Sequence, residues 1–419
     1  MQFRSFPILL ILVVSVALTA GANWPRFRGP GGSGVSDDTG LPTSWGPEES
    51  IVWQTPLPGF GTSSPITLGD KIFLTCYSGY GLDQDEPGDQ EDLLHHVVCL
   101  DRTTGKILWD KRSWALLPEQ DYSGFMALHG YASGTPVTDG QRVYVFFGRS
   151  GAWAYGLDGE LLWKKSVGKK THGWGSATSP ILHDDLVIIN ASVESQSIVA
   201  LDKATGKEAW RTEGVIESWS TPVIVATPEG SRELVVSMKN EAWGLDPKTG
   251  EKLWRCESVQ DYVCPSVIAQ DGIAYITSGR TPLTIAVRAG GRGDVTATHR
   301  LWELRETPRV PSPLVHDGLL YWVCDRGIAC CVDAATGEMV YEKRIPRFGK
   351  TYASVVLADG KLFAVSRENG AVVLAAGREF KLLAQNKLDD DSIFNATPVV
   401  SRSQLLLRSD RMLYCIGKK

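Results

Sequence analysis

The chain has 419 residues, of which 22% are charged, and its formal net charge at pH 7 is -5. This mild negative charge argues against a general nucleic-acid binder, which would need a strongly basic face. The length would allow two or three ordinary domains. However, a repeat runs through most of the chain without a break, and neighbouring repeats that bury each other's faces form one closed unit.

The first 22 residues have the pattern of a secretion signal. Arg4 supplies a positive charge, residues 7–20 are mostly apolar, and residues 20–22 (Ala-Gly-Ala) form a small-residue cleavage site. The apolar run is too short to cross a bilayer comfortably. We therefore expect residues 1–22 to be removed. The mature protein should be soluble, without a membrane span, and located in the periplasm or cell envelope or secreted.

Residues 23–50 contain no repeat and form a segment of their own. The stretch NWPRFRGPGGSGVS is rich in glycine and proline, which favours an extended arm or loop over a helix. Trp24, Phe27 and Trp45 indicate that this arm packs against the rest of the molecule.

Residues 51–419 are built from eight copies of one pattern. Four clear copies, LDRTTGKILW, LDKATGKEAW, LDPKTGEKLW and VDAATGEMVY, start at Leu100, Leu201, Leu245 and Val332. Each unit opens on a small residue next to Pro or Ser, and successive units are 71, 44, 42, 44, 47, 41 and 44 residues apart. A period in the low forties is typical of four-stranded propeller blades. The sequence predicts an all-β, eight-bladed β-propeller.

Each part of the repeat has an expected role. The second strand is almost entirely apolar, as in a strand covered on both faces. In the following turn the Asp binds backbone N–H groups and the Gly supplies a positive φ. The Trp on the fourth strand should pack against the next blade and donate its indole N–H to a carbonyl. We therefore expect Trp210 and Trp254 to be structural, and Trp174 and Trp219, in loops, to be more exposed.

The two ends of the repeat region complement each other. The last unit ends near Cys415 and Ile416 before any fourth strand, whereas residues 51–57 contain Trp53 without three preceding strands. Pairing these ends would close the ring and remove two exposed sheet edges.

The eight cysteines allow two interpretations. Export makes disulfides possible. Yet small residues alone fill the position before the Leu-Asp step, which suggests a tight space between blades; they are Cys99, Gly156, Ala200, Gly244, Ala286, Cys331 and Cys415. A bond between adjacent Cys330 and Cys331 is disfavoured, because neighbours on a strand point to opposite faces. Four cysteines remain as candidates for pairing: Cys76, Cys256, Cys264 and Cys324.

No motif predicts a catalytic residue or a metal ligand. The acidic insertion at residues 81–92 is a possible Ca²⁺ site, but its spacing does not match a twelve-residue Ca²⁺ loop, so a solvated loop is favoured. His95 and His96 should point in opposite directions and not form a chelate. Nucleophile-elbow, phosphate-loop, metalloprotease and paired-cysteine motifs are absent from the sequence.

The string x-D-x-x-T-G-x-x-x-W, with Ser-Pro and Asp-Gly steps before it, resembles the quinoprotein-type β-propeller repeats. That family includes dehydrogenases that use pyrroloquinoline quinone (PQQ) and a non-enzymatic lipoprotein of the outer-membrane β-barrel assembly machine. The strings WPRFRGP and LPTSW resemble those of secreted bacterial propeller-repeat proteins. PQQ with Ca²⁺ is implied only by the dehydrogenase branch, whose long insertions are missing here, so no cofactor is expected. The lipoprotein's anchoring cysteine is also missing.

One face of the propeller is a candidate binding surface. Basic residues follow the second strand of most blades and aromatic residues precede the first, and both loop classes emerge on the same face. The residues predicted to form this surface are Arg149, Trp174, Trp219, Lys239, Tyr262, Arg280, Arg326, Tyr352, Arg367 and Phe394. They would suit a protein partner with an acidic segment or a small anionic, aromatic ligand. The alternative is that the basic residues are solvated turn tips and the aromatic residues cap the channel.

The sequence thus favours an exported, non-catalytic propeller that acts as a binding or scaffolding module. A dehydrogenase-like enzyme that uses PQQ and a carbohydrate- or peptide-binding sensor remain as alternatives.

Overall fold

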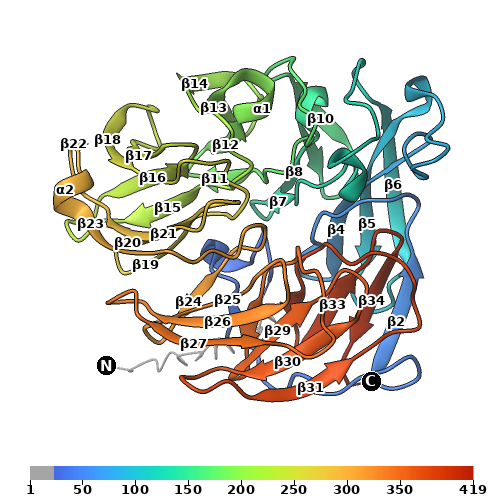
Figure 1. The fold of residues 1–419 in the computed structure, drawn as a ribbon. Helices are drawn as coiled ribbons and strands as arrows, with labels where there is room; N and C mark the ends of the chain where they lie inside the picture. Colours follow the sequence, from blue (N-terminus) through green and yellow to red (C-terminus); the bar gives the residue numbers. More distant parts are fainter. Residues whose placement is uncertain (1–22, 419) are drawn as a thin grey trace, which may run out of the picture.

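The computed structural model describes residues 23–418, so the predicted secretion signal lies outside the described residues. Eight antiparallel sheets are arranged around a central axis, and the chain passes from one to the next in order (Figure 1). The all-β, eight-bladed propeller predicted from the repeat is confirmed.

Each blade has four main strands, numbered outward from the axis. The strands of blades 1 to 4 are β3 (Ile66–Leu68), β4 (Lys71–Ser78), β5 (Leu94–Asp101) and β6 (Ile107–Trp114); β7 (Val137–Thr138), β8 (Arg142–Phe146), β9 (Ala152–Gly156) and β10 (Leu161–Lys165); β11 (Ile181–His183), β12 (Leu186–Ala191), β13 (Ser197–Asp202) and β14 (Glu208–Glu213); β15 (Val223–Ala226), β16 (Arg232–Ser237), β17 (Glu241–Leu245) and β18 (Lys252–Glu257).

The remaining blades follow the same plan. The strands of blades 5 to 8 are β19 (Ile268–Gln270), β20 (Ile273–Thr277), β21 (Thr284–Arg288) and β23 (Arg300–Leu304); β24 (Leu314–His316), β25 (Leu319–Val323), β26 (Ile328–Asp333) and β27 (Met339–Arg344); β28 (Val356–Ala358), β29 (Lys361–Val365), β30 (Ala371–Ala375) and β31 (Leu382–Asn386); β32 (Val399–Ser401), β33 (Gln404–Arg408), β34 (Met412–Ile416) and β2 (Ile51–Pro56). Two short strands, β1 (Val35–Ser36) and β22 (Gly293–Asp294), extend blades 7 and 4.

Six short helices lie outside the blades. They are η1 (Pro30–Gly32), η2 (Gln90–Asp92), η3 (Met126–Leu128), η4 (Gly148–Ser150), α1 (Ser192–Ser195) and α2 (Thr296–His299). None of the helices in residues 23–418 has the length and apolar character needed to cross a membrane.

The ring closes between the two ends of the chain, as predicted. Strand β2 pairs antiparallel with β34, and Trp53 lies opposite Cys415 (Figure 1). Two buried arginines bridge this seam. Arg102 of blade 1 donates to the Ser401 carbonyl of blade 8 at 2.6 Å, and Arg408 of blade 8 donates to the Thr75 carbonyl of blade 1 at 2.8 Å. Arg408, which could have been a turn-tip cation, is therefore part of the closure.

Tryptophans on the fourth strands join neighbouring blades. The indole N–H groups of Trp53, Trp109, Trp163, Trp210 and Trp302 donate to carbonyls in the turn of the next blade at 3.0–3.3 Å. The Gly of that turn lies against the ring: a Cβ at Gly206 would be 2.7 Å from Trp163. These contacts confirm the expected role of the repeat's Trp, and the Gly has the expected positive φ, +69° at Gly206.

Trp254 is an exception. Its indole N–H donates at 2.7 Å to the buried Glu233 carboxylate of its own blade. Glu233 also accepts from the backbone of Gly290 and the side chain of Arg292, which belong to the insertion at residues 289–299. Because this insertion replaces the usual tight turn of blade 5, a carboxylate takes the place of the turn carbonyl.

The small residues before the Leu-Asp step lie opposite the docking aromatic. Cys99 pairs with Trp109, Ala200 with Trp210 and Cys331 with Tyr341, each at a shift in strand register. In blade 2 the turn is shorter, and Ala154, not Gly156 as expected, faces Trp163. All eight cysteines lie in the described part of the chain and are free thiols there, including Cys330 and Cys331.

The N-terminal arm lies across the face that carries the Thr-Gly turns, here called the lower face. It bonds to three blades in turn: the Trp24 carbonyl accepts from Thr67, the Pro25 carbonyl accepts from Thr138, and Gly34 precedes β1, which pairs with β28. In Figure 1 this dark-blue segment lies at the centre of the ring. The arm thus covers the lower end of the central channel.

Candidate functional site

The central channel is lined by a ring of hydroxyl groups at the starts of the innermost strands. In seven successive steps, the hydroxyl oxygen of one blade accepts a hydrogen bond of 2.9–3.2 Å from the backbone N–H of the blade before it. The residues of this ring are Ser64, Thr135, Ser179, Thr221, Ser266, Ser312, Ser354 and Thr397. The small-residue step of the repeat is therefore both a blade-to-blade connection and the channel lining.

The channel differs at its two ends. Phe27 of the arm is part of the lining, and the arm covers the lower face. At the upper face, Trp174, Trp219, Tyr262 and Tyr352 line the channel. The result is a cavity of about 220 Å³ that opens among aromatic rings.

Three aromatic rings at the mouth contact Trp174. The Trp174 ring centroid is 4.3 Å from that of Tyr262, 5.0 Å from that of Trp219 and 4.9 Å from that of Phe125. Phe125 is 55% exposed, so this cluster presents apolar surface to solvent. Trp219, by contrast, is only 6% exposed and donates to the Gly175 carbonyl, so the expectation that it is an exposed loop residue is wrong.

A long insertion makes the mouth asymmetric. Residues 115–136, between blades 1 and 2, contain η3 and bring Phe125, Leu128 and His129 to the channel. His129 Nε2 is 2.7 Å from the Trp174 carbonyl, and Nδ1 is 2.6 Å from the Ser133 hydroxyl. Burial lowers the pKa of His129, which favours the neutral ring. His129 thereby fixes the position of the Trp174 loop.

One cation near the mouth is buried against an aromatic ring. Arg367 is 7% exposed, stacks on Tyr352 with its guanidinium carbon 4.5 Å from the ring centroid, and forms no ion pair within residues 23–418. Its Nη1 group is buried without a hydrogen-bond partner, and burial lowers its pKa. The Oδ1 atom of Asn395, a channel residue, is also buried without a partner. A buried donor without an acceptor costs free energy that a bound anion would recover.

Of the other predicted binding residues, Arg280 lies over a ring of the mouth, with its guanidinium carbon 5.8 Å from the Tyr262 centroid, whereas Lys239, Arg149 and Phe394 do not join this cluster. Lys239 is paired with Glu217 at 3.0 Å, Arg280 lies 3.9 Å from Asp261, and Arg149 donates to backbone carbonyls. Phe394 is buried and stacks on Tyr414 in the core of the last blade.

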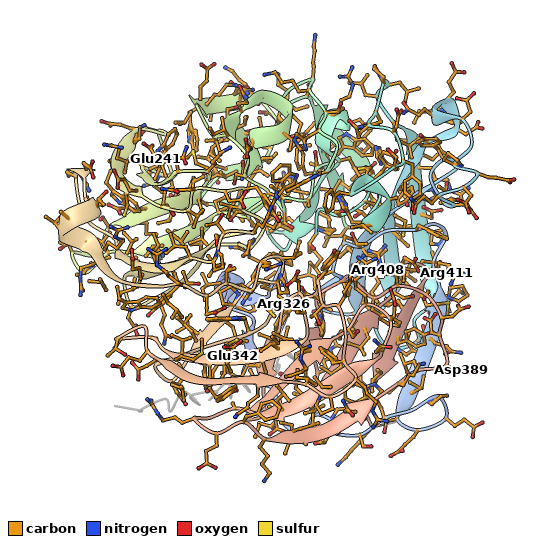
Figure 2. All side chains as sticks on the ribbon, viewed as in Figure 1. Glu241, Arg326, Glu342, Asp389, Arg408 and Arg411 are labelled. Atoms are coloured by element: carbon orange, nitrogen blue, oxygen red, sulfur yellow. The ribbon has the colours of Figure 1, made fainter. Side chains whose placement is uncertain are left out.

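Arg326 is the exception among the turn-tip cations. It is exposed and unpaired within the described chain, and it lies nearer the middle of the ring than Glu241 does (Figure 2). The aromatic half of the predicted surface is thus brought together at the channel. Of the cations, Arg367 and Arg280 lie over the rings of the channel residues Tyr352 and Tyr262, and Arg326 is unpaired in the described chain.

The channel does not fit a Ca²⁺-bound quinone. Its lining residues include no Asp or Glu, and residues 23–418 contain no group of three or more His, Cys, Asp or Glu able to hold a metal ion. Ca²⁺ takes six to eight oxygen ligands, among which carboxylates are prominent. The hydroxyl ring and the aromatic mouth offer no such ligand set.

His95 and His96 point to opposite faces of β5, as expected. His95 stacks on Phe147 of blade 2 with ring centroids 4.4 Å apart, whereas His96 bonds to Ser78 and Asp110 within blade 1. The acidic insertion is exposed over most of its length.

Sequence reasoning missed three residues at the mouth: Phe125, His129 and Asn395. The available signal was the 71-residue first step, which marks an insertion in blade 1. That step contains two insertions, residues 81–92 and 115–136, and the second carries Phe125 and His129; Asn395 instead follows the predicted Phe394.

The comparisons with known proteins agree with this fold. The chain matches the family described as "Outer membrane protein assembly factor BamB" over residues 94–343 and 194–418. No curated protein matches the sequence.

Solved structures share the architecture at low sequence identity. BamB from Moraxella catarrhalis aligns with a TM-score of 0.62 and 13% identity over 88% of this chain and 97% of that one. The computationally designed Ika8 protein aligns with a TM-score of 0.60 and 12% identity over 87% of this chain and 98% of that one. A europium-containing methanol dehydrogenase aligns with a TM-score of 0.49 and 13% identity over 84% and 89%. On the family match, which covers most of its length, the chain belongs to the BamB-like family of PQQ-type β-propeller repeat proteins.

Proposed function

We propose that this protein is an exported binding and scaffolding module of the cell envelope, and that its binding site is the channel mouth, which has no catalytic role. The observation that carries the proposal is a channel covered at its lower end and open among aromatic rings beside an unpaired, buried cation. The description of the family, which names outer-membrane protein assembly, supports a protein partner and an envelope location.

The size of the channel favours one side chain of a partner protein over a whole cofactor. Pockets for drug-sized ligands usually measure about 300–1,000 Å³, whereas this cavity has about 220 Å³. Aromatic anchors in small desolvated pockets commonly dominate protein–protein affinity. We infer that a partner inserts an apolar or aromatic side chain among Trp174, Tyr262 and Tyr352.

The charges at the mouth favour acidic residues next to that anchor. Arg367 is held against Tyr352, and neither it nor the exposed Arg326 forms an ion pair within the described residues. An Arg placed on an aromatic ring keeps its guanidinium edge free to bind a carboxylate. The partner segment should therefore combine an aromatic residue with neighbouring Asp or Glu.

Fluorescence anisotropy with a labelled peptide that carries one Trp flanked by acidic residues tests this proposal. Trp174→Ala and Arg326→Glu should each weaken binding by at least about tenfold, the range expected for a hot-spot contact. Lys207→Glu, an exposed substitution on the lower face, is the matched control and should bind like the wild type. Equal peptide affinity of the wild type and all three variants, or weaker binding by the control alone, would show that the binding site is not on the upper face.

The enzymatic alternative has its own test. A titration of the purified protein with PQQ and Ca²⁺, followed by the absorbance of the quinone, should show no saturable binding. Stoichiometric binding that Trp174→Ala abolishes would favour the dehydrogenase-like alternative over a scaffolding module.

A further inference from the structure

Blade 1 contains a serine, a histidine and an aspartate in a specific order across three strands. Ser78 is the last residue of β4, His96 lies on β5 and Asp110 lies on β6. The Ser78 hydroxyl is 2.8 Å from His96 Nε2, and His96 Nδ1 is 2.9 Å from Asp110 Oδ1. These three residues are separate from the channel and are not needed by the proposed function.

The hydrogen bonds connect the atoms that nucleophilic catalysis requires. Asp110 accepts from Nδ1–H, which leaves the lone pair of Nε2 directed at the serine hydroxyl. A base within 2.6–3.2 Å of a hydroxyl that is itself oriented by a third group is the arrangement that activates a serine. Arg112 Nε donates to the other Asp110 oxygen at 2.7 Å, which holds the carboxylate in place.

The serine is accessible, although the histidine is not. His96 is 1% exposed, whereas Ser78 is half-buried and lines a hollow of about 450 Å³ between blades 8 and 1. The volume lies within the usual range for ligand pockets. The walls are mainly apolar, formed by Leu57, Pro58, Phe60, Leu82 and Met412.

A cation borders the hollow, and a backbone N–H without a hydrogen-bond partner in the described chain follows Ser78. Arg411, labelled in Figure 2 near the seam between the last and first blades, borders the hollow and pairs with Asp391 at 3.0 Å. Gly79 follows the serine, and its N–H has no hydrogen-bond partner among residues 23–418. The amide that follows a nucleophilic serine is a common donor to the oxyanion of an acyl-transfer intermediate.

A neighbouring pair provides a comparison within the same blade. His95 Nε2 lies 3.1 Å from the Ser150 hydroxyl, but Nδ1 of His95 is buried without a partner. Burial lowers the pKa of His95 to about 3. Only the Ser78–His96 pair has the carboxylate that orients and stabilises a protonated imidazole.

We propose that Ser78, His96 and Asp110 form a second site with hydrolase activity toward esters that have a small apolar acyl group. Ser78 Oγ attacks the ester carbonyl as its proton passes to His96 Nε2, and the alcohol leaves with that proton. Water then attacks the acyl-serine, gives its proton to His96, and releases the carboxylic acid as Ser78 regains its hydrogen. One ester and one water thus yield one alcohol and one acid. Asp110 is a positioning residue in this scheme.

Covalent labelling of residues 23–419 with a fluorophosphonate probe tests the assignment. The probe phosphonylates activated serines with loss of fluoride, and peptide mapping by mass spectrometry identifies the modified residue. Ser78 should be labelled. Ser78→Ala should lose that label, and His96→Gln should slow it by about 100-fold or more, the usual contribution of a general base. Ser150→Ala is the matched control and should label at the wild-type rate.

A second readout separates catalysis from structure. Hydrolysis of p-nitrophenyl butyrate should fall strongly in Asp110→Asn, because an amide donates to the ring and favours the wrong tautomer, and recover in part in Asp110→Glu. Melting curves of each variant show whether it is folded. In a further test, Ser78→Cys supplies a thiol, which iodoacetamide should alkylate faster when His96 is present. Absence of label on Ser78 in the folded wild type, or labelling unaffected by His96→Gln, would overturn the proposal. Loss of peptide binding at the channel would leave the proposal of a hydrolase site at Ser78 intact.

Discussion

At the residue scale, the glycine of a Thr-Gly turn such as Gly206 has two separate functions, whereas the glycine of the Asp-Gly turn at Gly318 has one. Gly206 has φ +69°, which other residues adopt only at a cost, and the space next to it is filled by Trp163 of the preceding blade. Gly318 has φ +71° but has no atom within 4 Å of the position that a Cβ would take. The two glycines thus share a backbone conformation that would strain other residues, and they differ in packing.

Comparison of Gly206 with Gly318 separates the effect of backbone strain from the effect of packing. Gly318→Ala should cost about 1–2 kcal/mol of unfolding free energy from strain alone. Gly206→Ala should cost a further 1–3 kcal/mol, roughly, because the Trp163 ring must move. Denaturant unfolding of both variants measures the difference. Equal losses would mean that the ring can shift freely and that the turn glycine does not set the blade contact.

The buried carboxyl group of Glu194 should make the free energy of unfolding depend on pH. It is 2% exposed, accepts a hydrogen bond from Ser176, and burial raises its pKa from an ordinary 4.5 to about 7. The folded state therefore binds a proton that the unfolded chain has released, so stability is complete below pH 4.5 and falls as the pH rises through 7. The loss amounts to roughly 3 kcal/mol, at 1.36 kcal/mol per pKa unit.

Glu194→Gln should remove this loss and flatten the melting temperature between pH 5 and 8. Glu213→Gln, an exposed substitution nearby, should leave the wild-type slope. A wild-type slope in Glu194→Gln would show that another group is responsible.

At the element scale, β2 is the strand on which closure depends. It completes blade 8 across the chain ends, places Trp53 against blade 1, and covers an edge that would otherwise expose unpaired N–H and C=O groups. Deletion of residues 51–56 should therefore give aggregated or protease-sensitive protein. Deletion of residues 83–88, of equal length in the exposed acidic loop, should leave the melting temperature within a few degrees of the wild type. Limited proteolysis distinguishes the two, and a stable 51–56 deletion would disprove closure by β2.

The blades could be predicted from sequence because their contacts repeat. The Asp-x-x-Thr-Gly turn, the docking Trp and the missing fourth strand of the last unit recur at fixed spacing, so one physical explanation serves every copy. The contacts that occur once could not be predicted from the sequence. The Trp254–Glu233 bond, the seam arginines Arg102 and Arg408, and the position of His129 each depend on residues distant in sequence.

The candidate site was predicted in part for the same reason. Trp174, Trp219, Tyr262 and Tyr352 precede the first strand of their blades, and the propeller geometry directs all such segments toward the axis. Turn-tip cations have long side chains and many possible neighbours, so repeat position did not determine that Lys239 and Arg280 would lie within 4 Å of an acidic side chain while Arg367 would form no ion pair within the described residues. The Ser78–His96–Asp110 alignment spans three strands and has no local sequence pattern.

At the scale of the whole molecule, the N-terminal arm and the insertions make the two ends of the central channel different, so that the channel is open at one end. The arm covers the lower face, and the insertion at residues 115–136 brings Phe125 and His129 to the upper mouth. A site on the axis is in contact with every blade through the hydroxyl ring, so a partner bound there rests on a rigid support. The central claim is that partners are bound at this mouth and not on the outer strands of the blades.

Site-specific photo-crosslinking in the cell envelope tests this claim most directly. A benzophenone amino acid is placed either at Phe125, 55% exposed at the mouth, or at Leu108, 47% exposed on the outer strand β6. The account predicts a discrete protein adduct from position 125 that an acidic, Trp-containing peptide suppresses, and no adduct from position 108. A peptide-insensitive adduct at 125, or an adduct from 108 alone, would contradict it.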